Sequence, residues 1–574
     1  MEHFTKDFLV QSIKARGDAC FCTCQGEEKD TVYTYADLMR DVCKCMTLYD
    51  DIPAEGNLGL WAETGYEVIV ASLAAFLKGR LIAVADSSLS WEDAAALMKK
   101  TDVSTVIYGK AAAVNEAFLK DESFAKISAG GYADCEPASE KNFPDVEMKA
   151  PAIILFTSGT TGAGKGVVLS FYSLYMQKYL GDVRTRDRML SILPCYHIYF
   201  FVQLIYIIYS GSSVVLSKGV AYITEEMQKY KPTFLCVVPI LLVNLFEAAK
   251  RVADGNMQKV PLVIKKMTGG ELNAITTGGA GIDKSIFKYF NEAGIVVADG
   301  YGMTEFGGAV ATNMSRQDCS DSVGILSPFL ECKIVDGEVL LKSDVLFYGY
   351  YNDPEATDAV LKDGWFLTGD LGYIKDNRIY ITGRKKNLII LANGENVSPE
   401  ELERLIENGP DIDEVLVRED QNVICAEIYS KLYGTIENSE LINRINAYIN
   451  ELNAKLPSYK KIAKTKIRKE PLAKSNIGKI LRGVDYPPNV YLEKDYVAPT
   501  NEIEAMICKM AEEILEVERV GIDDDFLEMG VHSISFVRFN KALEDAGYKI
   551  DIPKMFENTT PRKLALLLSA SQKA

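Results

Sequence analysis

Short apolar runs alternate with helix-like stretches along the first two thirds of the chain. The runs Leu58–Ala62, Thr105–Tyr108 and Ile153–Phe156 are dominated by apolar side chains, which is typical of buried strands. The stretches Glu67–Leu77 and Trp91–Lys99 instead have the length and composition of helices. This alternation predicts an α/β fold whose sheets are largely parallel.

The alternation continues and then changes. Short apolar runs closed by Gly or Pro occur at 232–239, 274–277 and 294–297. After about Thr382 the chain has short predicted strands and charged helices, including Pro399–Asn408 and Ser439–Leu456. We therefore expect a smaller α+β unit to begin near Arg384.

The last part of the chain begins with a proline-rich stretch. Three prolines between Asp485 and Thr500, with little periodicity, indicate a semi-rigid linker. From Asn501 onward the pattern is helical and acidic, about the size of a small bundle. The predicted order is a large α/β domain with mixed sheets over 1–383, a small mobile α+β subdomain over 384–486, a linker over 487–500 and a four-helix bundle over 501–574.

Composition and charge narrow the class of protein. The 574 residues are 48% hydrophobic and 25% charged, as in folded domains, and this length calls for at least two of them. A formal net charge of -17 repels nucleic acid and anionic membrane surfaces. The N-terminus lacks a basic segment followed by an apolar one, and the most apolar run, 198–209, is too short to span a bilayer. We expect a cytoplasmic protein that binds neither nucleic acid nor membrane.

Five of the twelve cysteines, namely Cys20, Cys22, Cys24, Cys43 and Cys45, lie close together in the sequence. They could form a metal cluster, but Cys-x-Cys is not the spacing of common zinc sites, and alternate strand residues share a face without binding anything. The expectation is therefore free thiols packed as small hydrophobes.

A glycine-rich loop follows the predicted strand at 153–156. Residues 157–166 contain four glycines, several hydroxyl side chains and Lys165, which together offer N–H donors and positive charge to an anion. The predicted phosphate-binding residues are Thr157, Ser158, Gly159, Thr160, Thr161, Gly162 and Lys165. A P-loop is the alternative, but Gly166 takes the position where a Ser or Thr would bind magnesium.

The loop at 157–166 resembles the signature loop of the adenylate-forming superfamily, which includes acyl-CoA synthetases, luciferases and peptide-synthetase adenylation domains. Residues 277–281 (Thr-Gly-Gly-Ala-Gly) are similar to that family's adenine-contacting loop, which assigns Gly279 and Ala280. Residues 299–305 resemble the motif whose Tyr stacks on adenine, whose Thr meets the α-phosphate and whose Glu holds magnesium. The resemblance assigns nucleotide contacts to Asp299, Gly300, Tyr301, Thr304 and Glu305. An aromatic ring beside a hydroxyl and a carboxylate suits a nucleotide with its metal.

Three further motifs follow in the family's order. Residues 368–370 resemble the motif whose Asp, here Asp370, binds both ribose hydroxyls, and a carboxylate is a suitable acceptor for a diol. Residues 383–387 resemble the domain hinge, with Arg384 on the ribose and Lys386 as pivot. Lys479 matches the lysine that reaches the substrate carboxylate and the α-phosphate, where a compact cation would offset developing charge.

Two departures from the family pattern bear on the loop and the substrate. The chain has Gly164-Lys165-Gly166 where the family commonly has Pro-Lys-Gly, which keeps the lysine but loosens the turn. Peptide-synthetase domains place an Asp near 196–199 to pair with the amino group of their substrate, and 194–200 has none here. A buried unpaired ammonium would be costly, so the substrate is expected to be a fatty or aromatic acid rather than an α-amino acid.

His197 has two possible roles. In acyl-CoA synthetases a histidine at this position lines the acyl pocket near the substrate carboxylate, whereas a histidine among aromatic residues can simply be part of the core. The resemblance favours the pocket. The block 394–401 is also more similar to acyl-CoA synthetases than to peptide synthetases.

Residues 523–534 resemble the attachment motif of acyl and peptidyl carrier proteins, in which a Ser receives 4′-phosphopantetheine. Ser533 is that residue, and a helix N-cap role is compatible with the attachment. Residues 497–574 contain 14 acidic and 9 basic side chains, as expected for a carrier that docks on basic surfaces. The implied partners are a phosphopantetheinyl transferase and a condensing, reducing or thioesterase-type enzyme downstream.

The expected activity is that of an acid–thiol ligase that feeds an acyl-thioester or secondary-metabolite pathway. It would use ATP and Mg²⁺ to convert a carboxylic acid to acyl-AMP, with Lys479, Thr304, Glu305 and His197 as catalytic residues, and would then load its own carrier. A coenzyme A ligase with a vestigial carrier is one alternative. A non-catalytic nucleotide-binding adapter is another, but it would need neither Lys479 nor Glu305.

Overall fold

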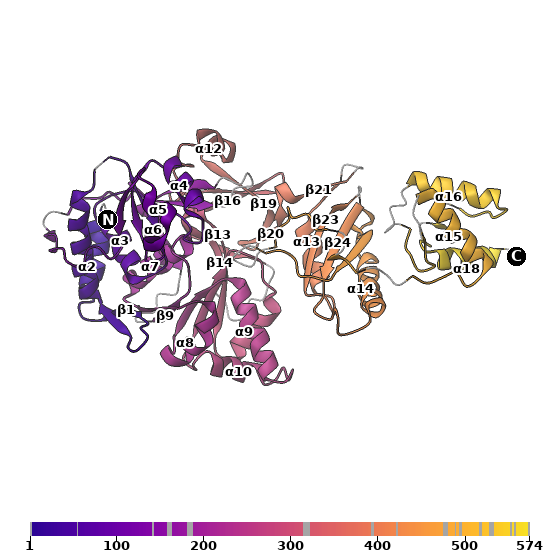
Figure 1. Ribbon diagram of the computed structural model, residues 1–574, viewed down its shortest axis with the longest axis horizontal. Helices are drawn as coiled ribbons and strands as arrows, with labels where there is room; N and C mark the ends of the chain where they lie inside the picture. The colour runs from indigo at the N-terminus through magenta and orange to yellow at the C-terminus, as the bar shows by residue number, and fades with distance from the viewer. Residues whose placement is uncertain are drawn as a thin grey trace. The chain divides into compact units, whose positions relative to one another are not determined.

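The computed structural model describes residues 3–53, 55–140, 143–157, 164–180, 187–313, 322–391, 395–420, 423–474, 480–487, 490–492, 496–515, 519–526, 533–551, 554–555 and 558–571. These residues form two compact units (Figure 1). The large unit comprises Met1–Thr368 and Gly372–Ile381, and the small unit comprises Gly369–Leu371 and Thr382–Ala574.

The first sheet of the large unit has six strands in the order β6-β5-β3-β4-β7-β8. Its neighbours are parallel except for β7 and β8, which are antiparallel and flank the glycine-rich loop. The strands are β3 (Asn57–Trp61), β4 (Ile82–Val84), β5 (Val103–Tyr108), β6 (Ala125–Ser128), β7 (Pro151–Thr157) and β8 (Lys165–Ser170). The three strands predicted in this region are therefore confirmed, with ends shifted by one or two residues.

The second sheet has fourteen strands, of which β13-β12-β11-β9-β10-β1 are parallel neighbours. The parallel run ends where β13 pairs antiparallel with β14, and the remaining order is β14-β15-β20-β19-β17-β16 on one side and β2 on the other. The strands are β1 (Cys20–Cys24), β2 (Thr31–Thr34), β9 (Arg188–Ser191), β10 (Ser213–Leu216), β11 (Phe234–Val237), β12 (Ala274–Gly278), β13 (Val296–Met303), β14 (Gly308–Asn313), β15 (Gly324–Leu326), β16 (Glu331–Val335), β17 (Glu338–Lys342), β18 (Leu361–Lys362), β19 (Trp365–Lys375) and β20 (Arg378–Arg384).

Helices cover these sheets, and α3 and α7 are buried along most of their length. The helix α7 is capped by Gly211, whose φ of 72° suits glycine in the left-handed cap position. Among the described residues no helix has the length and apolar character that a membrane crossing requires. The helices are α1 (Gln11–Lys14), α2 (Tyr35–Leu48), α3 (Tyr66–Leu77), α4 (Trp91–Lys100), α5 (Glu116–Lys120), α6 (Phe171–Met176), α7 (Ile198–Ser210), α8 (Ile223–Tyr230), α9 (Pro239–Val252), α10 (Val260–Met267), α11 (Phe287–Glu292) and α12 (Pro354–Val360).

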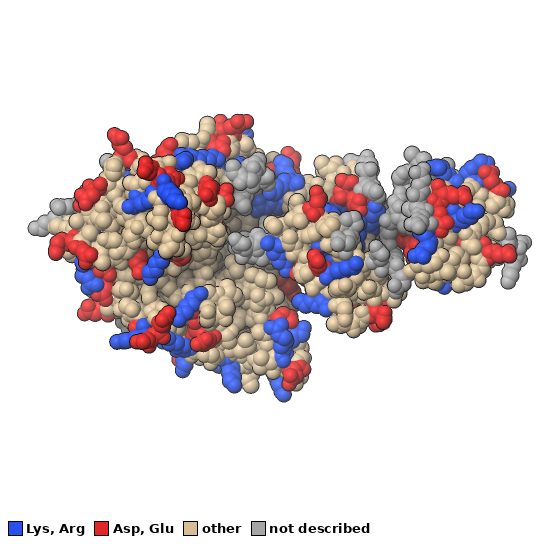
Figure 2. All heavy atoms as spheres, viewed as in Figure 1, with Lys and Arg blue, Asp and Glu red and all other residues tan. Residues whose placement is uncertain are grey.

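The small unit contains short sheets with two helices, followed by a helical region. Its elements are β21 (Ile389–Ile390), β22 (Asn396–Val397), α13 (Pro399–Glu407), β23 (Glu414–Asp420), β24 (Val423–Tyr429), α14 (Asn438–Asn453), β25 (Lys464–Arg468), α15 (Glu502–Leu515), α16 (Ser533–Asp545) and α18 (Pro561–Ser571). A separate core, which includes Ile507, Phe526, Phe539 and Leu564, holds the helical region together. The predicted succession of α/β, α+β and helical parts is confirmed. On the face shown in Figure 2, acidic and basic side chains are interspersed.

Part of the expected linker packs on the small unit. Val490 and Leu492 are buried, and Leu492 belongs to the core that includes β24 and β25. The backbone N–H of Leu492 donates to the carbonyl of Ile467 at 2.7 Å, and the N–H of Lys469 donates to that of Val490 at 2.7 Å. Residues 490–492 are thus fixed to the last strand of this sheet.

Candidate functional site

Two of the predicted nucleotide motifs lie on neighbouring strands. β12 and β13 are parallel with Thr277 opposite Asp299 and Gly278 opposite Gly300. A Cβ atom on Gly278 would lie 2.7 Å from the carbonyl oxygen of Gly300, so this approach requires glycine. The loop with Gly279 and Ala280 therefore leaves the sheet beside the segment that carries Tyr301, at the carboxyl ends of parallel strands, where open α/β sheets bind their ligands.

Asp299 is held by a lysine that the sequence did not single out. Lys284 Nζ lies 2.9 Å from Asp299 Oδ2, and both side chains are largely buried. The same Nζ donates to the carbonyl of Ser322 at 2.5 Å. Next to this pair, the hydroxyl of Thr277 is buried and has no hydrogen-bond partner among the described residues. A polar ligand beyond Gly279 could supply that partner.

Glu305, Tyr350 and Lys165 form one cluster. The hydroxyl of Tyr350 donates to Glu305 Oε1 at 2.9 Å, and Lys165 Nζ lies 4.7 Å from the centre of the Tyr350 ring. Burial, together with the negative charge of Glu305, holds the pKa of Tyr350 well above its usual range, so the phenol stays protonated and donates. The end of the phosphate loop and the carboxylate expected to hold magnesium are therefore brought together in the large unit.

His197 precedes the first residue of α7 and is half-buried. Its ring centre lies 4.8 Å from that of Tyr196. Burial lowers the pKa of His197, and the negative charge of Asp86 acts in the opposite direction. Burial and the same carboxylate raise the pKa of Tyr196 to about 12. Asp86 comes just after β4, so a carboxylate from another part of the chain faces the residues at which the sequence showed none.

The small unit holds three other predicted residues. Arg384 Nε lies 2.6 Å from Asp370 Oδ1, and the Asp370 side chain is only 3% exposed. The two residues assigned to the ribose are thus paired with each other. Lys386 is exposed in the short helix Lys385–Asn387, and Asn387 Nδ2 donates to Glu400 Oε1 at 2.6 Å. This hydrogen bond ties the predicted hinge to the start of α13.

Several predicted residues lie outside the described part of the chain. They are Ser158, Gly159, Thr160, Thr161, Gly162 and Lys479. Ser533 is the first residue of α16, as expected for an attachment site that is also a helix start, and its backbone alone is described. Thr157 is the last residue of β7 and Lys165 the first of β8, so the two ends of the predicted phosphate loop are opposite each other in an antiparallel pair.

Comparison with protein families decides the identity of this arrangement. Residues 10–351, more than half of the chain, match the family of AMP-binding enzymes. The chain is an AMP-binding enzyme. Residues 386–486 match the C-terminal domain of these enzymes, and residues 505–568 match the phosphopantetheine attachment site. The predicted combination of an adenylate-forming ligase with a C-terminal carrier region is confirmed.

Two curated relatives of this AMP-binding enzyme are named as a fatty-acid CoA ligase and an acyl-CoA synthetase. The long-chain-fatty-acid–CoA ligase FadD13 of Mycobacterium tuberculosis is 30% identical over 389 residues, which are 63% of this chain and 71% of that protein. The long chain acyl-CoA synthetase 2 of Arabidopsis thaliana is 28% identical over 394 residues, 58% of each chain. The chain thus spans little more than half the length of some relatives.

Two solved structures have the same fold. The McyG A-PCP structure complexed with phenylalanyl-adenylate matches with a TM-score of 0.73 at 19% identity and covers 98% of both chains. O-succinylbenzoate coenzyme A synthetase (MenE) from Bacillus subtilis, in complex with AMP, matches with a TM-score of 0.68 at 22% identity and covers 84% of this chain and 97% of that one. The first of these extends over the carrier region as well.

The described residues fit a nucleotide with one magnesium ion. No group of three or more metal-ligating side chains comes together in the described part of the chain. Magnesium bound with ATP needs only one or two carboxylates, because phosphates and water supply the other ligands. Glu305 would be such a carboxylate, with Lys165 nearby for phosphate charge, and the unpaired Thr277 hydroxyl lies by the predicted adenine loop.

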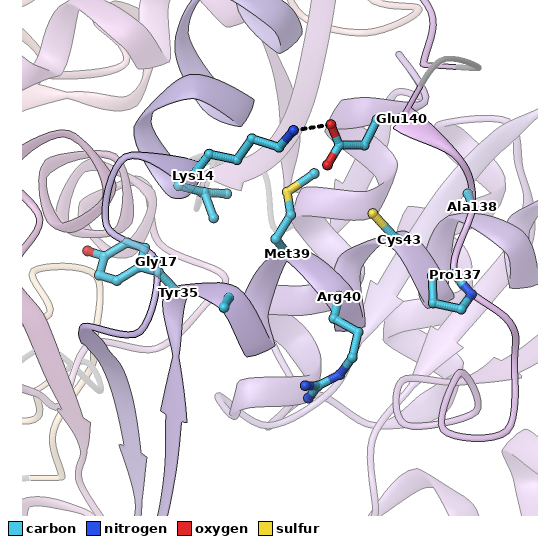
Figure 3. A pocket seen from close by; sticks show the side chains of 11 residues that line it. Lys14, Gly17, Tyr35, Met39, Arg40, Cys43, Pro137, Ala138 and Glu140 are labelled. Atoms are coloured by element: carbon cyan, nitrogen blue, oxygen red, sulfur yellow. Dashed lines mark hydrogen bonds and ion pairs between the residues drawn. The ribbon is translucent and has the colours of Figure 1, made fainter.

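A surface pocket of about 420 Å³ lies elsewhere in the large unit (Figure 3). Its lining comes from α1, α2 and residues 137–140, and Lys14 forms an ion pair with Glu140 at its edge. None of the predicted site residues lines it.

The residues that sequence reasoning missed, Tyr350, Lys284 and Asp86, carry no local motif, and their long-range contacts are what make them part of the site.

Proposed function

We propose that this AMP-binding enzyme activates a carboxylic acid with ATP and loads it on its own carrier region. The carboxylate attacks the α-phosphorus, which forms acyl-AMP and releases pyrophosphate. The thiol of the pantetheine on Ser533 then attacks the acyl carbon, and AMP leaves as the thioester forms. The observation that carries this proposal is the presence of an AMP-binding region and a phosphopantetheine attachment region in one chain.

The contacts of the large unit support a role for each residue. Lys165 would balance phosphate charge, and Glu305 would hold magnesium with Tyr350 fixing its orientation. Tyr301 and the Gly279–Ala280 loop would bind adenine, with Asp299 anchored by Lys284 beside them. Thr157 and the loop residues Ser158, Gly159, Thr160, Thr161 and Gly162 complete the proposed phosphate site, and Thr304 the α-phosphate contact.

The small unit would supply the remaining groups. Asp370 and Arg384 would bind the ribose, and Lys479 would offset charge on the α-phosphate during adenylation. We propose that the small unit then turns about Lys386, which withdraws Lys479 and admits the thiol. The domain division at 383/384 and 486/487, with a linker to 500 whose residues 490–492 pack on β25, is part of this proposal and is supported by the family matches at 386–486 and 505–568.

We propose a fatty or aromatic acid as the substrate. The relatives named above, a long-chain-fatty-acid–CoA ligase and a long chain acyl-CoA synthetase, support it. Asp86 favours the alternative, an α-amino acid substrate, because its carboxylate could pair with the ammonium group of such an acid. An α-amino acid therefore belongs in every substrate panel.

Pyrophosphate release tests the proposal, with the pantetheinylated full chain, Mg-ATP and a panel of fatty, aromatic and amino acids. We expect release with one acid class and a matching gain in intact protein mass. The matched variants are Ser533→Ala, which should release pyrophosphate but gain no acyl mass, and Ser535→Ala, which should behave as the wild type. No release with any acid would contradict adenylation.

Transfer to free coenzyme A is the second candidate, because the relatives named above are coenzyme A ligases. Tethering raises the local thiol concentration to the order of millimolar, so self-loading should dominate at micromolar coenzyme A. Acyl-CoA formation at an equal rate in Ser533→Ala and wild type, without any acylated protein, would favour the coenzyme A ligase.

A further inference from the structure

A row of polar side chains crosses three parallel strands of the large unit. Ser191 on β9 is opposite Cys236 on β11, and Cys236 is opposite Thr276 on β12. Residues opposite each other in parallel strands point to the same face of the sheet. The row lies at the carboxyl ends of the strands, and Thr276 is two residues before Gly278 of the proposed adenine loop.

The helix α7 covers this row with two polar side chains of its own. Tyr199 and Gln203 are four residues apart and therefore share a face of the helix. The hydroxyl of Tyr199 lies 2.5 Å from Thr276 Oγ1, and Thr276 donates to Cys236 Sγ at 3.3 Å. One turn further on, Ser191 Oγ donates to Gln203 Oε1 at 2.6 Å.

One polar atom in this arrangement is unsatisfied. Gln203 is 2% exposed, and its Nε2 has no hydrogen-bond partner among the described residues. If the amide were turned by 180°, its nitrogen would bond to Ser191 and its oxygen would have no partner instead. One polar atom of Gln203 is therefore unsatisfied in either orientation. An apolar residue of the same volume would avoid this cost in a helix that is otherwise almost wholly apolar or aromatic.

The position of the row relates it to the acid. His197, proposed to line the acyl site, is two residues before Tyr199, and Tyr199 and Thr276 are less buried than Cys236 and Gln203. The row thus leads from the proposed site into the interior. We infer that the acyl group carries a hydroxyl that bonds to this row of Tyr199, Thr276 and Gln203. The inference rests on the proposed function.

A hydroxyl is the group that suits the row best. It both donates and accepts, so it can bond to the Gln203 amide in either orientation and to the hydroxyl of Tyr199 or Thr276. Sites built to bond a substrate hydroxyl discriminate strongly against the analogue without it, because their own polar groups are then left unpaired. An unsubstituted alkanoate or benzoate would leave the row as it is.

Pyrophosphate release by the pantetheinylated full chain tests the inference with acids that differ by one hydroxyl group. Benzoate is compared with its 2-, 3- and 4-hydroxy derivatives, and octanoate with 3- and 8-hydroxyoctanoate, so the two arms separate rings from chains. We expect kcat/KM to be roughly tenfold or more higher for one hydroxy acid than for its parent. Tyr199→Phe and Gln203→Leu should each reduce that ratio, with less effect on the parent acid.

Tyr206→Phe is the matched control, because it removes a hydroxyl from the same helix that bonds to Asp187 at 3.1 Å rather than to the row. It should leave the ratio unchanged, and thermal melting of each variant separates misfolding from altered preference. If kcat/KM of each parent acid equals or exceeds that of every hydroxy acid, the inference is overturned, although adenylation itself is supported. An unchanged ratio in both row variants would also overturn it. No release with any acid would instead contradict the proposed function itself.

Discussion

The two units each bury an ion pair, and the surroundings of the two pairs differ. In the large unit Lys284 meets Asp299 at 2.9 Å, at the end of β13 beside a glycine loop with an unpaired hydroxyl. In the small unit Arg468 on β25 meets Glu427 on β24 at 3.1 Å, both side chains are wholly buried, and Arg468 Nη2 also has no hydrogen-bond partner among the described residues. The first pair borders a proposed ligand site, whereas the described groups around the second come from β23, β24, β25, Tyr486 and Tyr491.

Burial of charge therefore does not distinguish a site from a scaffold. Glu427 also accepts from Tyr491 at 2.8 Å and pairs with Arg418, and the Arg468 guanidinium lies 3.7 Å from the centre of the Tyr486 ring. These contacts join β24 and β25 to Tyr486 and Tyr491. Adjacency to an open glycine loop, as at Asp299, is the feature that points to a ligand.

The largest expected effect is on the stability of the small unit. Glu427→Gln should destabilise it by about 3 kcal/mol, because a buried guanidinium loses its counter-charge. Hydrogen exchange of peptides from β24 and β25, measured across a urea series, gives the local stability. Glu440→Gln is the control, since its pair with Arg444 is exposed and should contribute less than about 0.5 kcal/mol. Equal effects of the two variants would remove the distinction drawn between a structural pair and a surface pair.

A smaller effect, on function rather than stability, is expected in the large unit. Lys284→Met should lower kcat/KM for ATP roughly tenfold, or about 1.4 kcal/mol, because Asp299 loses its anchor beside the adenine loop. ATP–pyrophosphate exchange measures this, normalised to folded protein. Lys288→Met, an exposed lysine four residues further on, should have no effect. A variant that melts earlier yet keeps its kcat/KM would make this pair structural as well.

The smallest expected effect concerns Asp86 and His197. Because the carboxylate raises the pKa of His197 against burial, Asp86→Asn should lower that pKa further. A lowered pKa means that the unfolded chain binds the proton first, so this group costs stability as the pH falls below about 6.5. The chain has 3 histidines, so NMR of labelled imidazoles can follow each of them. A rise in the His197 pKa in Asp86→Asn would contradict the arrangement.

The sequence predicted what depends on local pattern. The runs at 153–156 and 274–277 are strands, and Trp91–Lys99 lies within α4, because apolar periodicity decides such elements. The run at 294–297 revealed only the beginning of β13, which continues through Tyr301 to Met303. Pairing with β14, a contact from later in the chain, sustains this polar and glycine-containing half.

The residues of the candidate site also fall into those that the local sequence predicts and those that only the fold reveals. Motif residues such as Glu305 and Asp370 could be named from their neighbours in sequence. Tyr350, which bonds to Glu305 from 45 positions away, could not, because its contact arises from the fold. The predicted end of α14 at Leu456 was also three residues too far, since the helix ends at Asn453, whose side chain bonds to the backbone of Ile462 instead.

Because residues 490–492 are fixed to β25, only a short segment of chain connects the small α+β subdomain to the carrier region. Leu492 belongs to one core, whereas Tyr496 already lies against Arg519 of the carrier region, 3.8 Å from ring centre to guanidinium. Four peptide steps separate Leu492 from Tyr496, and even fully extended they reach about 14 Å. In the proposed reaction the backbone at Tyr496 stays within that distance of Leu492 when the subdomain of residues 384–486 turns, so this turn would guide the pantetheine thiol toward acyl-AMP.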